Sequence, residues 1–154
     1  MHQFDLKNKT AVITGGAQGF GLDIAKKFLS SGSKVFIWDI DEKELLKATK
    51  EISNENLSYN VVDVSKFDQI QKAVNDIKSK NNIDILINNA GITGPTAELW
   101  NYDVSNWNSI VDINLNGTFY CCKLIVPHMI KNNYGRIVNI ASVAGKDGNA
   151  NASA

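Results

Sequence analysis

Short apolar runs alternate along the chain with longer segments of helical periodicity. The runs are rich in β-branched residues and nearly continuous, as expected for strands that are buried on both faces of a sheet. They are AVI at 11–13, VFIW at 35–38, YNVV at 59–62, ILI at 85–87 and RIVNI at 136–140. Between the first four runs, the pattern predicts helices over 20–31, 41–52 and 66–80.

A longer helix is predicted between the last two runs, over about 104–132. Its apolar residues recur at spacings of three and four, which predicts an apolar stripe along the helix. The stripe comprises Val104, Trp107, Val111, Leu115, Phe119, Cys122 and Val126.

Two shorter helices begin with capping signals. Asp41 precedes Glu44 at the spacing of a capping box, and Ser65 has the same relation to Asp68.

The resulting order of elements is β-α-β-α-β-α-β-α-β. Strands that alternate with helices pair in parallel through right-handed crossovers, so the pattern predicts an α/β fold with a doubly wound parallel sheet. No repeat, low-complexity tract or linker interrupts the order. The 154 residues therefore correspond to a single domain or to part of one.

The balance of charge limits the possible partners. The chain has 16 Lys and Arg residues against 16 Asp and Glu residues, so it carries no net field that would attract nucleic acid. Its first ten residues are polar, and no run approaches the roughly 20 apolar residues of a membrane span. We therefore expect a cytoplasmic protein that binds neither nucleic acid nor membranes.

Neither the cysteines nor the histidine of the long helix indicates a metal or a catalytic base. Cys121 and Cys122 are adjacent, so on a helix they point about 100° apart, and no ligand-spaced partner lies nearby. We expect core or surface thiols, with no metal site and no disulfide. His128 follows Pro127 without a neighbouring carboxylate pattern, which favours a surface residue near the helix C-terminus.

Chemistry is first indicated by TGGAQGFG at 14–21, which joins the first predicted strand to the first predicted helix. Gly15, Gly19 and Gly21 allow a tight turn, close approach of the backbone to a pyrophosphate and packing of helix on strand. The helix N-terminus supplies partial positive charge. An ordinary glycine-rich turn is the alternative, but the strand before it and the helix after it favour a phosphate site.

Asp39 ends the second predicted strand, about 20 residues beyond the glycine turn. In dinucleotide-binding folds, an acidic residue at this place accepts hydrogen bonds from the adenosine ribose. The alternative role for Asp39 is a cap of the next helix, for which Asp41 is better placed. Together, the turn and the acid predict a dinucleotide site.

The glycine spacing Thr-Gly-x-x-x-Gly-x-Gly resembles that of the short-chain dehydrogenase/reductase family, and further motifs follow in the family's order. NNAG at 88–91 resembles its second signature, and DINLNG at 112–117 resembles the helix that carries its active-site asparagine. NIAS at 139–142 resembles the strand that ends in its active-site serine. Asp63 and Val64 match the pair that flanks the adenine ring. The resemblance covers about 10–145 and implies a Rossmann-type fold.

The resemblance also implies that the cofactor is NAD. Asp39 would repel the 2′-phosphate of NADP, and neither Gln18 nor Ile40 supplies a cation to offset this repulsion. The expected cofactor-binding residues are Gly15, Gln18, Gly19, Phe20, Gly21, Asp39, Ile40, Asp63, Val64, Asn89, Ala90 and Gly91.

Two catalytic residues follow from the same resemblance. Ser142 would donate a hydrogen bond to the oxygen of the reacting carbonyl, and Asn114 would order a water of the proton relay. The structural alternatives are a strand-end cap for Ser142 and a buried amide that ties helix to strand for Asn114. Of the pair Asn88 and Asn89, one is expected to steady the strand ends. Asn89 and the backbone of Ala90 and Gly91 are expected to face the cofactor ribose.

The family's general acid and base is a tyrosine thirteen residues after the serine, with a lysine four residues further on. Counting from Ser142 reaches the first position beyond Ala154. The resemblance therefore implies that the chain stops before this motif and that the C-terminal strands and helices of the family are missing. We expect residues 1–154 to be one dinucleotide-binding domain, incomplete at its C-terminus and catalytically inactive alone.

The predicted function is an NAD(H)-dependent oxidoreductase that interconverts a secondary alcohol and a ketone by hydride transfer. The motifs are most similar to those of 3-oxoacyl-acyl-carrier-protein reductases and of sugar and polyol dehydrogenases, so the substrate is a small molecule or is linked to an acyl carrier. Two alternatives are a non-catalytic nucleotide-binding or regulatory protein and a structural assembly module. The apolar long helix 104–132 and the family resemblance predict a homodimer or homotetramer that pairs through this helix.

Overall fold

The computed structural model describes residues 5–154 and contains one sheet of five parallel strands in the order β3-β2-β1-β4-β5. The strands are β1 (Thr10–Thr14), β2 (Lys34–Asp39), β3 (Leu57–Val61), β4 (Ile85–Asn88) and β5 (Arg136–Asn139). The helices are α1 (Gly19–Ser30), α2 (Glu42–Ile52), α3 (Phe67–Lys78), α4 (Val104–Ile110), α5 (Gly117–Lys131) and α6 (Ala144–Asp147). A 3-10 turn (Leu99–Asn101) precedes α4, and a π-helical segment (Val111–Asn116) joins α4 to α5. The predicted α/β fold is confirmed.

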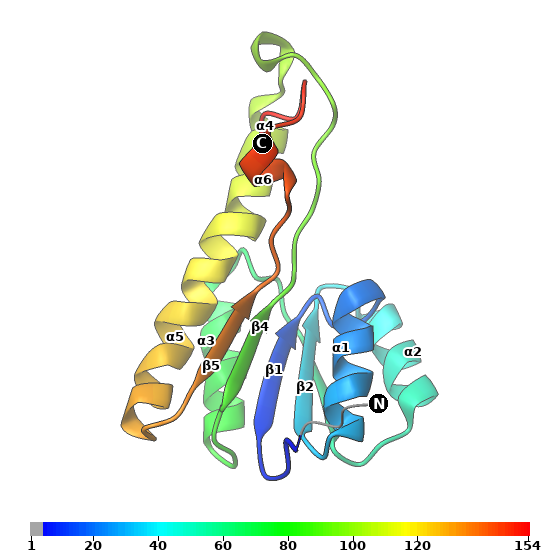
Figure 1. Ribbon diagram of the computed structural model, residues 1–154, viewed down its shortest axis with the longest axis vertical. Coiled ribbons are helices and arrows are strands. Elements are labelled where there is room, and N and C mark those ends of the chain that lie inside the picture. Colours follow the sequence, from blue (N-terminus) through cyan, green and yellow to red (C-terminus); the bar gives the residue numbers. More distant parts are fainter. Residues whose placement is uncertain (1–4) are drawn as a thin grey trace.

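Helices cover both faces of the sheet (Figure 1). Side chains alternate along each strand, so Ala11 and Ile13 of β1 pack beneath α1 and α2, while Val12 between them packs beneath α3 and α5. All three are fully buried. Burial of each such valine or isoleucine contributes about 1.5–3 kcal/mol, and this explains why a strand of five residues suffices at the centre of the sheet.

The strand order creates a switch in direction beside β1. The chain runs outward from β1 through β2 to β3 and then returns to β4, which pairs with the other edge of β1. The connections after β1 and β4 therefore leave the sheet toward opposite faces. In open α/β sheets, ligands bind in the crevice that such a switch opens at the carboxyl ends of the strands.

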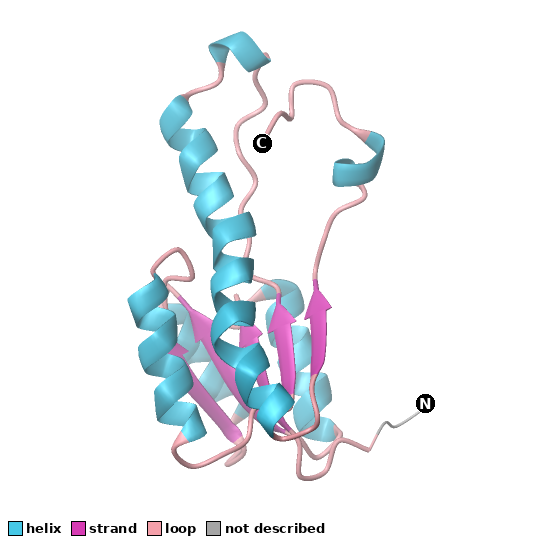
Figure 2. Ribbon diagram, turned by 90° about the vertical axis from the view of Figure 1, so that its left-hand side faces the viewer, coloured by secondary structure: helices cyan, strands magenta, loops and turns pink. Residues whose placement is uncertain are grey.

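The long helix is present, and it extends past the carboxyl ends of the strands (Figure 2). The predicted apolar stripe is wrong as a description of its buried face, because Val104, Leu115 and Phe119 are each more than half exposed. The buried residues are Ile110, Gly117, Cys121, Ile125 and Met129. This side faces the core because Gly117 allows the helix to approach closely there: a Cβ on Gly117 would lie 3.0 Å from Val64 Cγ2.

One predicted N-cap is confirmed and the other is wrong. Asp41 accepts hydrogen bonds from the backbone N–H groups of Lys43 (2.9 Å) and Glu44 (3.1 Å), as a cap of α2 should. Ser65 does not cap α3, whose N-cap position is Lys66. The Ser65 hydroxyl instead donates to Asp63 Oδ1 at 2.7 Å, because that carboxylate also takes the Ser65 N–H and holds the residue in a turn.

The strands differ in burial from the prediction. Every residue of β1 and β4 is buried, as expected, but all four residues of β5 are exposed. Within residues 5–154, β5 pairs with β4 on one side and with no strand on the other. β3 begins at Leu57 and ends at Val61, two residues earlier than expected at its start and one at its end.

Two segments rise beyond the carboxyl end of the sheet, one after β4 and the other after β5 (Figure 1). They meet where the Ala97 N–H donates to the Asn151 carbonyl oxygen at 2.9 Å. Both segments are largely exposed. None of the helices within residues 5–154 combines the length and apolar character needed to cross a membrane.

Candidate functional site

The glycine turn between β1 and α1 has a backbone that side chains would disturb. Gly15 has φ +62°, and a Cβ there would lie 2.9 Å from the Ala90 Cα. Gly21, in the first turn of α1, is buried, and a Cβ on it would overlap the Gly15 carbonyl oxygen. The turn therefore folds tightly back on the start of the helix, which is the geometry that brings backbone N–H groups close to a bound anion.

Thr14 locks the turn after β1 to the turn after β4. Its hydroxyl oxygen accepts the backbone N–H groups of Asn89 (3.0 Å) and Ala90 (2.9 Å). In the opposite direction, the Asn89 side-chain amide donates to the Thr14 and Gly15 carbonyl oxygens, both at 3.0 Å. The amide nitrogen of Asn89 is thus committed to the glycine turn, so this residue holds the two loops together at the switch point.

Asn88 joins the ends of β4 and β5. Its side chain is buried, and its amide nitrogen donates to Asn139 Oδ1 at 2.8 Å across the two strands. This is the position expected for the member of the asparagine pair that steadies the strand ends. The Asn88 carbonyl oxygen also accepts the Ile140 N–H at 2.9 Å, which directs the chain from β5 toward Ser142.

Asp39 ends β2 beside the glycine turn. Its carboxylate accepts the backbone N–H of Ala17 and that of Asp41, both at 3.2 Å. It does not cap α2, since Asp41 receives the N–H groups of that helix. Asp39 therefore fixes the turn on one side and presents its carboxylate at the same end of the sheet.

A cavity of about 340 Å³ opens where these loops converge. It is lined by Gly15, Gln18, Asp39, Ile40, Val62, Asp63, Val64, Asn89, Ala90, Gly91, Ile92 and Ile113. Nine of these twelve are residues that the sequence assigned to the cofactor. The other three assigned residues, Gly19, Phe20 and Gly21, do not line it; Phe20 is 78% exposed.

Three lining residues, Val62, Ile92 and Ile113, escaped the sequence analysis. Each is an ordinary apolar residue next to a residue singled out in the sequence: Val62 precedes Asp63, Ile92 follows Gly91, and Ile113 precedes Asn114 within DINLNG. Their position beside these residues was the only feature of the sequence that could have identified them as part of the site. They provide the apolar wall that a planar ring requires.

The charges around the cavity are negative. Its lining contains the carboxylates of Asp39 and Asp63 and no lysine or arginine. The first turn of α1 contains no acidic residue, so the partial positive charge of that helix terminus is not neutralised by its own side chains. This end of the sheet suits a ligand that combines a backbone-bound phosphate with hydroxyl groups facing Asp39.

Asn114 lies in the π-helical segment, and its side chain pairs with the loop after β4. Its Oδ1 accepts the Ile92 N–H, and its Nδ2 donates to the Ile92 carbonyl oxygen, both at 2.9 Å. The amide thus ties the long helix to the rim of the cavity, although the residue is exposed rather than buried. π-helical segments occur often at functional sites because they free backbone groups from the regular helical pattern.

Ser142 lies outside the cavity lining, in the exposed segment after β5. Its hydroxyl oxygen accepts the backbone N–H of Ala144 at 3.1 Å, at the start of α6. The contact resembles a helix cap, which was the structural alternative for this residue. It leaves the hydroxyl proton available as a donor.

The family follows from comparison with known proteins. The model of the short chain dehydrogenase family matches residues 9–154. The chain belongs to the short-chain dehydrogenase family. A curated relative, 2-dehydro-3-deoxy-L-rhamnonate dehydrogenase (NAD(+)) of Sphingomonas sp. (strain SKA58), is 43% identical over 147 residues, which are 95% of this chain and 58% of that protein. The 3-oxoacyl-acyl-carrier-protein reductase FabG of Chlamydia trachomatis is 38% identical, over 93% of this chain and 59% of its own length.

Solved structures agree with this short-chain dehydrogenase assignment. NAD+-bound xylitol dehydrogenase superposes with a TM-score of 0.90 at 30% identity, covering 96% of this chain and 58% of that chain. The crystal structure of gox2181 has a TM-score of 0.90 at 34% identity, with 94% and 58% covered. The chain therefore spans a little under 60% of the length of the relatives it matches.

The two cysteines of this short-chain dehydrogenase are free thiols. Burial raises the pKa of Cys121 to about 12, so its thiol stays neutral in the core. Cys122 is half-buried, and its Sγ accepts a weak hydrogen bond from Asn88 Nδ2 at 3.5 Å. Across residues 5–154, no three His, Cys, Asp or Glu side chains gather in a way that would hold a metal ion.

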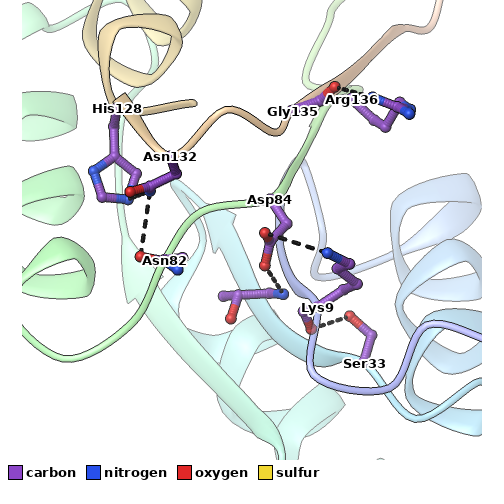
Figure 3. Close-up of polar contacts among 9 residues, drawn as sticks. Lys9, Ser33, Asn82, Asp84, His128, Asn132, Gly135 and Arg136 are labelled. Carbon is purple, nitrogen blue, oxygen red and sulfur yellow. Dashed lines mark hydrogen bonds and ion pairs between the residues drawn. The ribbon is translucent and has the colours of Figure 1, made fainter. Parts of the chain in front are cut away.

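His128 lies far from the cavity, in the last turn of α5 at the amino-terminal end of the sheet (Figure 3). Its Nε2 is 2.9 Å from Asn132 Nδ2, which also donates to Asn82 Oδ1 at 3.2 Å. An amide donor at Nε2 requires the neutral imidazole. His128 therefore takes part in the packing of this end, as a partly exposed residue near the helix C-terminus.

The protonation of His128 is expected to weaken the fold at acidic pH. Burial first, and then the charges of Lys78 and Lys131, lower the pKa of His128 below 6.5. The unfolded chain therefore binds this proton more readily. The contribution of neutral His128 is fully present above about pH 6.5 and is lost as the pH falls below this value and through the lower pKa of the folded state. Between pH ~7.5 and ~5.5, the thermal midpoint should fall less in a His128→Gln variant than in the unmutated protein. An identical fall in both would contradict this prediction.

Proposed function

We propose that the protein is an NAD-dependent oxidoreductase that interconverts a secondary alcohol and a ketone by hydride transfer. The observation that carries the proposal is the cavity of about 340 Å³ at the carboxyl end of the sheet, with the glycine turn, Asp39 and the backbone of 89–91 in its walls. The names of two similar proteins, an NAD(+)-dependent rhamnonate dehydrogenase and an NAD+-bound xylitol dehydrogenase, support the choice of cofactor.

The residues of the cavity fit NAD in their chemistry. The turn from Gly15 to Gly21 would hold the pyrophosphate against the N-terminus of α1. Asp39 would accept hydrogen bonds from the adenosine ribose, and Asp63 with Val64 would flank the adenine. When bound, NAD supplies or accepts the hydride at its nicotinamide ring.

Ser142 and Asn114 are proposed to act on the substrate oxygen and on its proton. The Ser142 hydroxyl already accepts the Ala144 N–H, so its own proton is free to be donated to the carbonyl oxygen of a ketone. Both amide atoms of Asn114 are committed to Ile92, so a relay water would be held by the backbone of Asn114 rather than by its side chain. We assign the general acid to the tyrosine that the family's spacing places thirteen residues after Ser142, outside residues 1–154.

Selectivity for NAD tests the cofactor assignment. A 2′-phosphate within about 4 Å of the Asp39 carboxylate costs roughly 1–4 kcal/mol at effective dielectric constants between 80 and 20. No lysine or arginine in the cavity lining offsets this repulsion. We expect titration calorimetry to give an affinity for NAD at least about tenfold higher than for NADP, and Asp39→Ala to narrow the difference.

The matched control is Asp76→Ala, which removes a carboxylate from the exposed surface of α3 and should leave the NAD to NADP ratio unchanged. Equal affinities for the two nucleotides in the unmutated protein would contradict the role given to Asp39.

The substrate is proposed to be a 3-oxoacyl group linked to an acyl carrier or, as the second candidate, a sugar or polyol. The names of the relatives support both, since they include a 3-oxoacyl-acyl-carrier-protein reductase and dehydrogenases of rhamnonate and xylitol. Parallel assays of the whole protein with a 3-oxoacyl thioester and with a polyol panel distinguish the two. We also propose a cytoplasmic location and, on the balanced charge, no nucleic-acid partner.

The protein is proposed to assemble as a homodimer or homotetramer through the long helix 104–132. Trp107, Leu115 and Phe119 are 41%, 65% and 56% exposed on this helix, and burial of such side chains between two copies would be favourable. Light scattering of the whole protein at micromolar concentration should give a dimer or tetramer. Phe119→Glu should shift it toward the monomer, whereas Leu46→Glu on α2, a substitution at a comparably exposed leucine, should not. A monomeric unmutated protein would contradict the proposal.

A further inference from the structure

A second cavity lies at the amino-terminal end of the sheet, opposite the proposed cofactor site. Its volume is about 380 Å³, and its polar walls come from the residues at the start of β1 and β2 and from the loop before β4. The side chains that determine its chemistry are Lys9, Lys34, Asn81, Asn82 and Asp84. None of them takes part in the cofactor cavity.

The lining of this cavity contains two lysines and a single carboxylate. Asp84 is buried and accepts the Thr10 N–H at 2.9 Å, and its other oxygen lies 3.9 Å from Lys9 Nζ (Figure 3). Lys34 is half-buried, and its Nζ donates to Asn81 Oδ1 at 2.9 Å. Within residues 5–154, no carboxylate lies within 4.0 Å of Lys34 Nζ. The cavity thus retains one positive charge without a counter-charge.

The side-chain oxygens of the two lining asparagines Asn81 and Asn82 already accept hydrogen bonds. Asn81 Oδ1 accepts from Lys34, and Asn82 Oδ1 accepts from Asn132 Nδ2 at 3.2 Å (Figure 3). Each asparagine therefore keeps its amide NH₂ group as the part free to bind a ligand. Hydrogen-bond donors without acceptors, next to an uncompensated ammonium group, suit a ligand that brings negative charge and several acceptor oxygens.

Lys9 is held in place by an aromatic ring. Its Nζ lies 3.6 Å from the centroid of Tyr134, and the Arg136 guanidinium lies 4.8 Å from the same centroid. These contacts limit the motion of the Lys9 side chain before any ligand binds, so less conformational entropy is lost on binding.

We propose that this cavity is a binding site for a phosphate group, held by Lys9 and Lys34 with the amide groups of Asn81 and Asn82. The phosphate is that of free inorganic phosphate or of a small phosphate ester. The site is independent of the proposed hydride-transfer function, because it shares no residue with the cofactor cavity.

Calorimetric titration of the whole protein with inorganic phosphate tests this site, with NADH present in excess so that the glycine turn is not available to phosphate. We expect saturable binding that Lys34→Gln weakens by about tenfold to a hundredfold, as expected for the loss of a charged hydrogen-bond donor. Lys72→Gln, which removes a lysine from the exposed surface of α3, should bind as the unmutated protein does.

A parallel titration with glycerol 1-phosphate identifies the source of the phosphate group. Tighter binding of the ester than of inorganic phosphate assigns the cavity to a metabolite, and equal or weaker binding assigns it to the free ion. Absence of saturable binding up to about 10 mM of either probe, or equal binding by Lys34→Gln and the unmutated protein, would overturn the proposal.

Discussion

A polypeptide that ends at Ala154 is expected to bind NADH and yet to reduce no ketone. Residues 5–154 include the glycine turn, Asp39 and Ser142, whereas the general acid that we propose, thirteen residues after Ser142, would stand at position 155. Hydride transfer without that proton leaves an alkoxide that Ser142 can hydrogen-bond but that no assigned group protonates. NADH consumption, followed by its absorbance with 3-oxoacyl and polyol-derived ketones, should stay at the rate without protein. The whole protein is expected to turn over.

Tyr134 and Tyr120 are already engaged in packing contacts and are not placed to act as the general acid. Tyr134 lies between Lys9 and Arg136 at the amino-terminal end of the sheet, and Tyr120 packs edge-on against Phe67 with ring centroids 5.4 Å apart. Turnover by the 154-residue polypeptide would contradict the assignment and direct attention to Tyr102, because His128 lies at the opposite end of the sheet from the cavity. Within residues 5–154, β5 has no strand on its outer side, and this exposed edge should also make the polypeptide poorly soluble, because such edges pair between molecules.

Replacement of Gly21 by alanine is expected to disable the nucleotide site. The added methyl group would overlap the Gly15 carbonyl oxygen and crowd the Asn89 amide. Neither group can move away without breaking the hydrogen bond between them, which joins the two loops. Overpacking of this kind costs about 1–3 kcal/mol. We expect a lower thermal midpoint and a loss of at least about tenfold in NADH affinity by fluorescence titration.

Gly145→Ala is the matched control, because a Cβ at Gly145 meets no atom within 4 Å. This variant should retain both the thermal midpoint and the NADH affinity of the unmutated protein. If Gly21→Ala bound NADH as tightly as Gly145→Ala, the close approach of turn and helix would not be required for the cofactor.

The order of elements was predictable because each strand is a compact β-branched run and each helix has its own apolar periodicity. Asp41 was predictable as a cap because its signal is local. Ser65 carried the same local signal, but Asp63, only two residues away, took its hydroxyl. The buried face of the long helix was not predictable, because two of its faces are apolar and the close approach at Gly117 selects the one that contains this glycine.

The candidate site was likewise predictable in part from the sequence. Motifs located most of the cavity, because glycines and carboxylates at strand ends have few other uses in this fold. Val62, Ile92 and Ile113 carry no chemical signal and were found only when the loops came together. The commitment of the Asn89 amide to the glycine turn also depends on contacts between residues more than 70 positions apart, which a linear pattern does not encode.

A crystal structure of the whole protein grown with NAD+ tests the dinucleotide site most directly. The expected result is a dinucleotide whose pyrophosphate lies against residues 15–21 and whose adenosine ribose hydroxyls contact the Asp39 carboxylate, with the nicotinamide on the side of Asn114 and Ser142. A dinucleotide bound elsewhere on the molecule, or bound in this cavity with its ribose away from Asp39, would contradict the assignment.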